Sequence, residues 1–485
     1  MTLKRQFLWS MAPLLVISVI NLFSVPWFYR YLGADGYALW FYVQTFIGTF
    51  GFMDFGFGGA VGRYIGVALG RGDTVAVKAY WATGNAIAIP LLAVMAAVFI
   101  VLGVTLGPKW FNVKPENILL LRWAFAAGGV GLFLNFYGQF WNTLSQAHLD
   151  FKFLSILGTV NNLLQILPAI FWAWLTHNPL LIIVWGVFVS LLQLSVLVWH
   201  SRAHYGLGFN LRAASLQRLR EMGSFTSKIF GTQLLNNVFG SVDRLILGRL
   251  ATPAAYTHYM ISVNTGMRMV ALTQSAMGPV FHNTSRAVGG SGKMTTAEIY
   301  NTTFRFIFGW CLLASVWVIV WHPLLLRLWL GAELGSQVAP VFPPIFVALC
   351  ICAIANISGS QLAPLNRAGT ILIFTAISIP VSIGCVLTGW HMYGIRGVAF
   401  GVLCARVVEL SRDIYLIRLV KAGGWLAPAT WLHILVQGAI GFGFYLVARW
   451  TNGSLIILSF LAALHFTGVA LWLVRSNMRS ESQFK

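Results

Sequence analysis

Long apolar stretches separated by short polar connections dominate the pattern along the chain. A bilayer span needs about 20 apolar residues, and windows of that length predict about fourteen helices here. They begin near Met11, Tyr37, Ala79, Ile118, Phe153, Pro179, Phe225, Tyr256, Ile299, Val338, Thr370, Arg396, Ala429 and Gly453. The first apolar run is too long for a signal-peptide core and lacks a small-x-small cleavage pattern, so we expect a retained first helix.

The composition supports the same class of protein. The chain is 58% hydrophobic and only 9% charged, whereas soluble domains carry about 25% charged residues. The sequence therefore predicts an all-α polytopic membrane protein.

The charge is strongly positive, with a formal net charge of +20. On a soluble chain such an excess would indicate nucleic-acid binding. Here most Lys and Arg residues fall in alternate connections, which is the pattern of topogenic charge on the inner side of a membrane. We therefore expect a multi-pass protein of the cytoplasmic membrane with both termini in the cytoplasm, an even number of spans and no nucleic-acid partner.

The five cysteines all lie in apolar segments, without a CxxC pair or a His-rich neighbourhood. Such placement is typical of small buried residues and predicts neither a metal site nor a disulfide framework. We expect no metal and no cofactor.

A weak internal repeat has an offset of about 220 residues. Arg30–Tyr37 and Arg249–Tyr256 each place an arginine ahead of a tyrosine that opens a predicted span. Trp141–Gln146 and Gln361–Asn366 end spans at corresponding positions. The repeat predicts two six-helix halves of the same orientation. In membrane proteins built from such repeats, binding sites usually lie between the halves near the bilayer midplane.

The repeat also divides the chain. We expect an N-terminal lobe, a C-terminal lobe and two additional helices, over residues 1–205, 206–425 and 426–485.

Arginines in the apolar stretches carry the clearest indication of function. A charge at membrane depth costs at least roughly 2.5–3.5 kcal/mol and so normally faces a cavity, a partner or a substrate. Few carboxylates accompany these arginines, which favours a pocket for an anion whose phosphate oxygens arginine forks could bind. The candidate substrate-binding residues are Arg63, Arg122, Arg244, Arg268, Arg305 and Arg406.

These arginines are not equivalent. Arg268 lies in the middle of a predicted span with no carboxylate at helical spacing, and it is the strongest candidate. Arg122 and Arg305 lie one turn inside their spans, and Arg244 lies near a span end. For these three, the structural alternative is a side chain that extends to interfacial water.

Two acidic residues in apolar segments are candidates for ion coupling near the start of each half. Asp54 lies in a glycine-rich run, and regular helix geometry places it about 180° from Arg63, so a direct pair would need distortion. Asp243 adjoins Arg244 and is about 100° from it. An uncompensated carboxylate at this depth is costly, so either residue must be hydrated, paired or functional.

Glu409 is the third candidate for ion coupling. It shares a helix face with Arg406 and Asp413, at spacings i, i+3 and i+7. A self-neutralising Arg406–Glu409 pair is the structural alternative. A desolvated Glu409 would instead be able to exchange a proton near neutral pH.

Three stretches resemble a known family. Arg30–Tyr37 is similar to its first loop, Met53–Ala60 with Arg63 to its second helix, and Ser241–Gly248 with Tyr256 to its seventh helix and following loop. The family is the polysaccharide transporter family of the multidrug/oligosaccharidyl-lipid/polysaccharide (MOP) exporter superfamily, which includes the O-antigen (Wzx-type) flippases.

The resemblance implies a MATE-like bundle of two six-helix lobes with two extra helices, a central cationic cavity and alternating access. It implies an undecaprenyl-diphosphate-linked oligosaccharide as cargo, surrounded by membrane lipids, and leaves polysaccharide polymerase machinery as a candidate partner. Lipid II transport shares the same chemistry and stays open. A cation-coupled multidrug exporter should favour buried carboxylates over arginines. A membrane glycosyltransferase would need paired acidic residues or a large outer loop, so we do not expect an enzyme.

Overall fold

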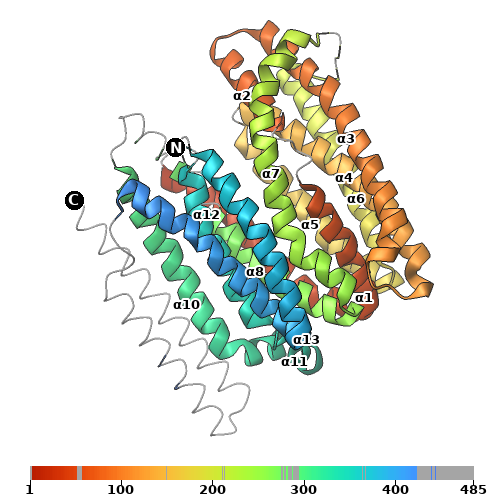
Figure 1. Ribbon diagram of the computed structural model, residues 1–485. Coiled ribbons are helices and arrows are strands. Elements are labelled where there is room, and N and C mark those ends of the chain that lie inside the picture. Colours follow the sequence, from red (N-terminus) through yellow and green to blue (C-terminus); the bar gives the residue numbers. More distant parts are fainter. Residues whose placement is uncertain are drawn as a thin grey trace. The chain divides into compact units, whose positions relative to one another are not determined.

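The fold is helical throughout the described part of the chain (Figure 1). In this computed structural model the described residues are 3–51, 57–148, 150–209, 211, 213–274, 277, 280–281, 284, 287, 294–362, 364–365, 367–422, 439 and 443. The chain divides into two compact units, Met1–Thr257 and His258–Lys485. The boundary lies within α8, so the lobe boundary expected after residue 205 stays a prediction.

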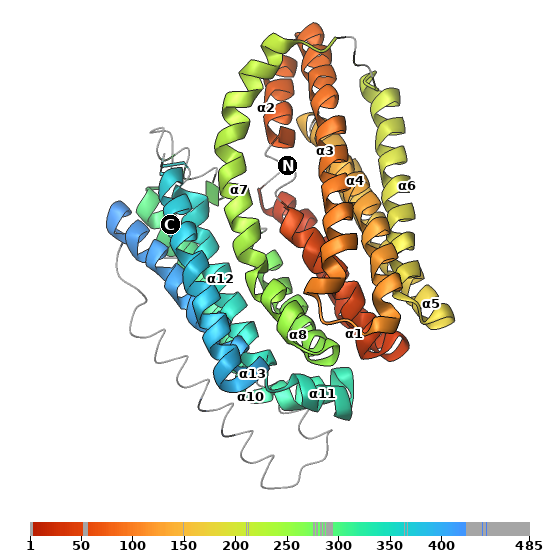
Figure 2. The ribbon, with the colours of Figure 1, turned by 45° about the vertical axis from the view of Figure 1, so that its right-hand side comes forward.

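Unit 1 is built from long helices joined by short turns. Its elements are α1 (Leu3–Thr49), α2 (Phe57–Gly70), α3 (Thr74–Trp110), the 3-10 helix η2 (Pro115–Asn117), α4 (Ile118–Ala147), α5 (Phe151–Thr176), α6 (Pro179–Tyr205) and α7 (Leu216–Leu250). The helices α3, α4 and α6 lie side by side in both ribbon views (Figures 1 and 2).

Unit 2 takes most of α8 (Pro253–Gln274) and all later elements. These are α10 (Thr296–Leu330), α11 (Ala332–Val338), α12 (Phe342–Leu362) and α13 (Ala368–Val420). Helix α12 packs against both α10 and α13 (Figure 2).

Local capping chemistry sets several helix ends. The Asp73 carboxylate accepts the Ala76 N–H at 2.8 Å and opens α3. The Asn178 side chain accepts the Leu180 N–H at 2.9 Å ahead of Pro179 in α6. Each side-chain acceptor satisfies one of the backbone N–H groups that a first turn leaves unpaired.

Helices α4 and α6 begin at Ile118 and Pro179, where the apolar pattern predicts spans.

Two predicted connections are much tighter than expected. Helix α1 joins the first two expected spans across a break at Gly33 (φ 68°), and α13 joins two later spans across a break at Gly394 (φ 58°). Glycine adopts a positive φ without a Cβ penalty. Gly33 alone breaks α1, whereas Tyr393 and Gly394 together break α13.

Seven of the described helices are long and apolar enough to cross a membrane, judged by length and composition. They span residues 74–110, 115–147, 152–176, 179–205, 296–330, 342–362 and 369–420. The all-α polytopic fold is confirmed, and fourteen stays a predicted number. The helices expected from Ala429 and Gly453 lie outside the described residues.

Aromatic packing around glycine holds the interior of unit 1 together. The Phe125 ring of α4 lies against Gly103 and Gly107 of α3, where a Cβ would approach the ring carbons to 2.5 Å. Phe99 and Phe46 surround the same ring, at centroid distances of 5.9 and 5.3 Å. Small residues let helices approach closely, which matters where lipid supplies no hydrophobic driving force between them.

The two arms of α13 cross at glycines. A Cβ on Gly389 would collide with the Gly397 carbonyl, a Cβ on Gly397 with the Gly389 carbonyl, and one on Gly401 with the Cys385 carbonyl. The obstructing atoms belong to the backbone, so no side-chain rotation can relieve such a collision.

We predict that Gly397→Ala destabilises the protein by roughly 1–3 kcal/mol, because the added methyl group forces the two arms apart. Thermal unfolding in detergent measures the effect. Gly384→Ala in the same helix is the matched control, since a Cβ there meets nothing within 4 Å. Equal unfolding midpoints for the two variants would contradict this account of the crossing.

Candidate functional site

In unit 1, Arg244 and Asp243 lie toward the C-terminal end of α7. Asp243 is 8% exposed, and its Oδ1 lies 4.0 Å from Arg244 Nε. The Arg244 guanidinium donates to the Gly240 carbonyl and, at 3.4 Å, to Ser241 Oγ. Its Nε is buried without a hydrogen-bond partner in the described part of the chain. The Arg244 Nε thus meets the Asp243 carboxylate at ion-pair distance without forming a hydrogen bond.

The position of Arg244 is fixed from two sides. A Cβ on Gly48 of α1 would lie 3.9 Å from Arg244 Nη1, so the guanidinium faces α1. Beyond Arg244, the Trp110 indole donates to the Leu245 carbonyl at 3.0 Å, and the Asn112 N–H donates to the Gly248 carbonyl at 3.0 Å. These bonds tie the end of α7 to the end of α3.

The tyrosine of the repeated motif has a packing role here. Tyr256 is fully buried and shares a 2.7 Å hydrogen bond with Thr45 of α1. Its ring lies 4.6 Å from that of Tyr42. The motif thus places a buried aromatic anchor at the start of α8 rather than a reactive group.

In unit 2 the Arg406–Glu409 pair is present. Arg406 Nη1 lies 2.5 Å from Glu409 Oε1, and the two side chains are 12% and 11% exposed. The fold therefore forms the self-neutralising pair that the sequence analysis gave as the structural alternative. Both residues stay proposed site residues, but a substrate or a coupling ion would have to compete with the ion pair between them.

The other candidates are placed as follows. Arg122 and Arg305 are exposed on α4 and α10, and Arg268 is half-buried on α8. Arg63 belongs to α2, but its side chain lies outside the described structure, as does Asp54. Of the predicted site residues, the fold brings Asp243 close to Arg244, and Arg406 close to Glu409.

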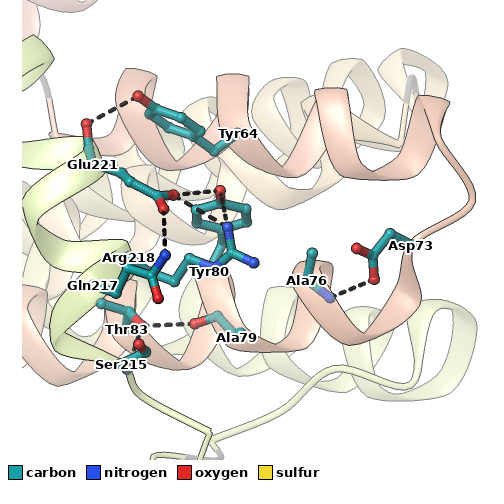
Figure 3. A network of polar contacts seen from close by, with 10 residues as sticks. All are labelled: Tyr64, Asp73, Ala76, Ala79, Tyr80, Thr83, Ser215, Gln217, Arg218 and Glu221. Atoms are coloured by element: carbon teal, nitrogen blue, oxygen red, sulfur yellow. Dashed lines mark hydrogen bonds and ion pairs between the residues drawn. The ribbon is translucent and has the colours of Figure 1, made fainter.

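One polar network was not anticipated from the sequence (Figure 3). Tyr80 of α3 donates to Glu221 Oε2 at 2.8 Å, and Arg218 donates to the Tyr80 hydroxyl at 2.7 Å and to Glu221 at 3.2 Å. Tyr64 of α2 donates to the Glu221 carbonyl at 2.9 Å. The sequence shows the i, i+3 spacing of Arg218 and Glu221, but their tyrosine partners lie in segments far away along the chain.

The network fastens the first turns of α7 to α2 and α3. Arg218 also lies over the Tyr80 ring, with its guanidinium carbon 4.6 Å from the ring centroid, an added cation–π contact. The Tyr80 hydroxyl, followed by the Arg218 guanidinium, holds the pKa of the Glu221 carboxyl below its usual range.

A second cluster joins the ends of α4, α5 and α6. Asp150 accepts from the Phe153 N–H at 3.3 Å, from the Tyr205 hydroxyl at 3.0 Å, and contacts His200 Nε2 at 2.9 Å. The His200 ring stacks on Phe153 at 3.6 Å. Partial burial alone would raise the pKa of Asp150, but the hydrogen bonds from His200, Tyr205 and Phe153 outweigh it and lower that pKa.

We expect Tyr80→Phe to lower the stability of the protein by about 0.5–1.5 kcal/mol, since one hydroxyl that joins α3 to α7 is lost. The change should appear as a reduced unfolding midpoint. Tyr393→Phe removes a hydroxyl from a 72% exposed side chain and serves as control. A midpoint for Tyr80→Phe equal to that of the control would show that the network adds nothing to stability.

The Asp150 cluster predicts a pH dependence with a defined sign. Because the folded-state pKa of Asp150 is lowered, its stabilising contribution is present above the unfolded pKa of about 3.9 and is lost as pH falls through the folded value. Asn caps a helix as well as Asp, so Asp150→Asn keeps the cap and removes the charge together with one acceptor oxygen. The unfolding midpoint of wild type should exceed that of the variant at neutral pH and converge with it below about pH 4. A constant difference across that range would refute the linkage.

Comparison with solved structures defines the fold class. An inward-closed structure of the lipid II flippase MurJ matches with a TM-score of 0.75 and 13% identity, covering 97% of this chain and 99% of that chain. An inward-facing multidrug resistance MATE family transporter matches with a TM-score of 0.66 and 14% identity, over 84% of this chain and 94% of that one. A MOP superfamily transporter from Pyrococcus furiosus matches with a TM-score of 0.62 and 14% identity, over 86% and 96%.

The chain thus has the fold of MOP superfamily transporters. The family model for polysaccharide biosynthesis proteins matches residues 3–284, and the chain belongs to this family. No curated protein matches the sequence.

Proposed function

We propose that this protein is a flippase that carries an undecaprenyl-diphosphate-linked oligosaccharide from the cytoplasmic to the outer leaflet of the cytoplasmic membrane. The observation that carries the proposal is the fold shared with a lipid II flippase over nearly the whole of both chains. Membership of the polysaccharide biosynthesis family supports a glycan as the cargo. Transport would proceed by alternating access between two lobes.

The physical task of such a protein is to carry a diphosphate past hydrocarbon. Transfer of an isolated ion into an apolar medium costs tens of kcal/mol unless other groups replace its water. Arginine suits this task, because its planar fork can bind two phosphate oxygens at once and stays charged. Arg244, whose buried Nε makes no hydrogen bond and lies 4.0 Å from the Asp243 carboxylate, and Arg268, half-buried on α8, are the residues we assign first to the diphosphate.

Two alternatives remain within the same fold. A cation-coupled multidrug exporter is the first, but the MATE structure covers 84% of this chain against 97% for the lipid II flippase. A lipid II flippase is the second, and its cargo shares the same chemistry, so charge does not separate the two. We retain Asp54, Asp243 and Glu409 as candidates for coupling transport to an ion gradient.

The first test is translocation of a fluorescent undecaprenyl-diphosphate-linked oligosaccharide in proteoliposomes that contain the full chain. Arg268→Ala should slow translocation by roughly tenfold or more, because a charge-assisted hydrogen bond contributes about 1.5–3 kcal/mol. Arg268→Lys should retain part of the rate, since it keeps the charge but loses the fork.

The control is Arg367→Ala. Arg367 is exposed, precedes α13 and makes no side-chain capping bond there, so this variant should transport normally. Equal rates for Arg268→Ala and wild type would remove Arg268 from the proposed site. Export of a fluorescent organic cation, with no movement of the lipid-linked glycan by wild type, would overturn the proposal in favour of a drug exporter.

A further inference from the structure

Four amide side chains form one face of α4 in its second half. Asn135, Gln139, Asn142 and Gln146 are spaced at i, i+4, i+7 and i+11. At about 100° per residue, these positions lie within about 60° of one another around the helix axis. Asn135, Gln139 and Gln146 are exposed, and Asn142 is half-buried. These four residues are called the amide face of α4.

The amide face lies on the side of α4 away from its exposed apolar residues. The large exposed apolar side chains of this helix are Leu119, Trp123 and Val130. Helix geometry places them about 150° from the amide face on average. Lipid is expected to cover the apolar side, so α4 has two different exposed surfaces, and the amides do not continue the lipid-facing one.

Nearer the start of α4, neighbouring helices cover the side that carries the amides. Leu121, Ala124 and Gly128 lie on this side and are buried. A Cβ on Gly128 would lie 2.8 Å from the Val43 side chain of α1. By contrast, a Cβ on Gly138, between the first two amides, would meet nothing within 4 Å. The amide face therefore continues a surface that faces the interior of unit 1, and this surface is open where the amides lie.

An open amide face in a membrane helix needs a polar environment. Helix α4 lies within one of the candidate membrane spans, 115–147. Gln139 Nε2 donates to Asn135 Oδ1 at 2.7 Å, but each amide group carries two donors and an acceptor oxygen with two lone pairs. Transfer of such groups into an apolar medium is unfavourable unless hydrogen bonds compensate it. Water or a polar ligand is therefore expected beside this face.

The next helix carries further amides at a similar depth. Asn161 and Gln165 lie one turn apart on α5, which leaves the same short turn as α4. Both side chains are half-buried, and Asn161 Oδ1 is buried without a hydrogen-bond partner in the described part of the chain. The main neighbours of α4 are α3 and α6, whereas α5 packs mainly on α1 and α6. A polar ligand beside the amide face would thus have amides of two helices within its depth range.

We propose that the amide face of α4 binds the glycan part of the cargo through hydrogen bonds to sugar hydroxyl groups. The inference rests on the proposed function and assigns the sugar, whereas the arginines are assigned the diphosphate. An amide donates and accepts hydrogen bonds, as a hydroxyl group does, while arginine only donates. Because amides are neutral, they bind a neutral sugar without the cost of desolvating a charge.

The test compares two fluorescent probe lipids that bind to the full-length protein in detergent. One is an undecaprenyl-diphosphate-linked oligosaccharide, and the other is undecaprenyl diphosphate without sugar. Wild type should bind the first more tightly. Gln139→Leu should raise the Kd of the first by roughly two- to tenfold, as expected for one lost hydrogen bond, and leave the Kd of the second unchanged. Microscale thermophoresis measures both constants.

Two further variants sharpen the comparison. Gln139→Asn keeps an amide and should lose less affinity for the glycan-bearing lipid than Gln139→Leu. Gln193→Leu changes a half-buried amide of α6 and should leave both constants as in wild type. Thermal unfolding of each variant checks that the fold is kept.

Several results would overturn the inference. One is equal affinity of wild type for the two lipids, and another is an equal change, or no change, of both constants in Gln139→Leu. A third is a change of oligomeric state in Gln139→Leu with both constants intact, because the amides would then join two copies of the chain. Failure of the proposed function has a different signature, namely selective binding of the glycan-bearing lipid without translocation by wild type.

Discussion

A charge in an apolar segment is costly unless it finds a partner or reaches water, because hydrocarbon offers neither. The fold obeys that constraint in several ways. Arg406 binds Glu409 one turn away, and Arg412 reaches to a hydroxyl and a carbonyl of α12. The same demand on backbone groups explains why the described chain is helical, since a helix satisfies its N–H and C=O groups within one segment.

The arginines also differ in how completely their charge is paired, and this difference suits them to different roles. A guanidinium bound to a carboxylate is already neutralised, so a substrate anion must compete with that carboxylate. Arg244 is held less tightly, because its carboxylate partner Asp243 lies 4.0 Å away and its hydrogen bonds go to a carbonyl and a hydroxyl. Such a group can still gain from an incoming phosphate, which is why it ranks with Arg268 in the proposed function.

The polar clusters also differ in how completely they are paired, according to how deeply they are buried. Tyr80 with Glu221, and Asp150 with His200, lie near helix ends and are well supplied with hydrogen bonds. They act as fasteners between helices. Asp413 is as polar but fully buried, and the hydroxyl groups of Tyr300 and Ser358 face it. Satisfied clusters stabilise one arrangement of the chain, whereas an incompletely paired buried acid is costly to ionise.

The sequence alone determined the class of fold and most helix starts, such as Pro179 of α6, because apolar run length is a local property of the chain. It also identified Arg406 and Glu409 as a possible pair, since i, i+3 spacing fixes their proximity. Only the tertiary structure decided that Tyr80 meets Glu221, 141 residues away, and that Asp413 faces Tyr300. Those contacts depend on how each helix is rotated and tilted against its neighbours, and no local pattern of residues specifies that.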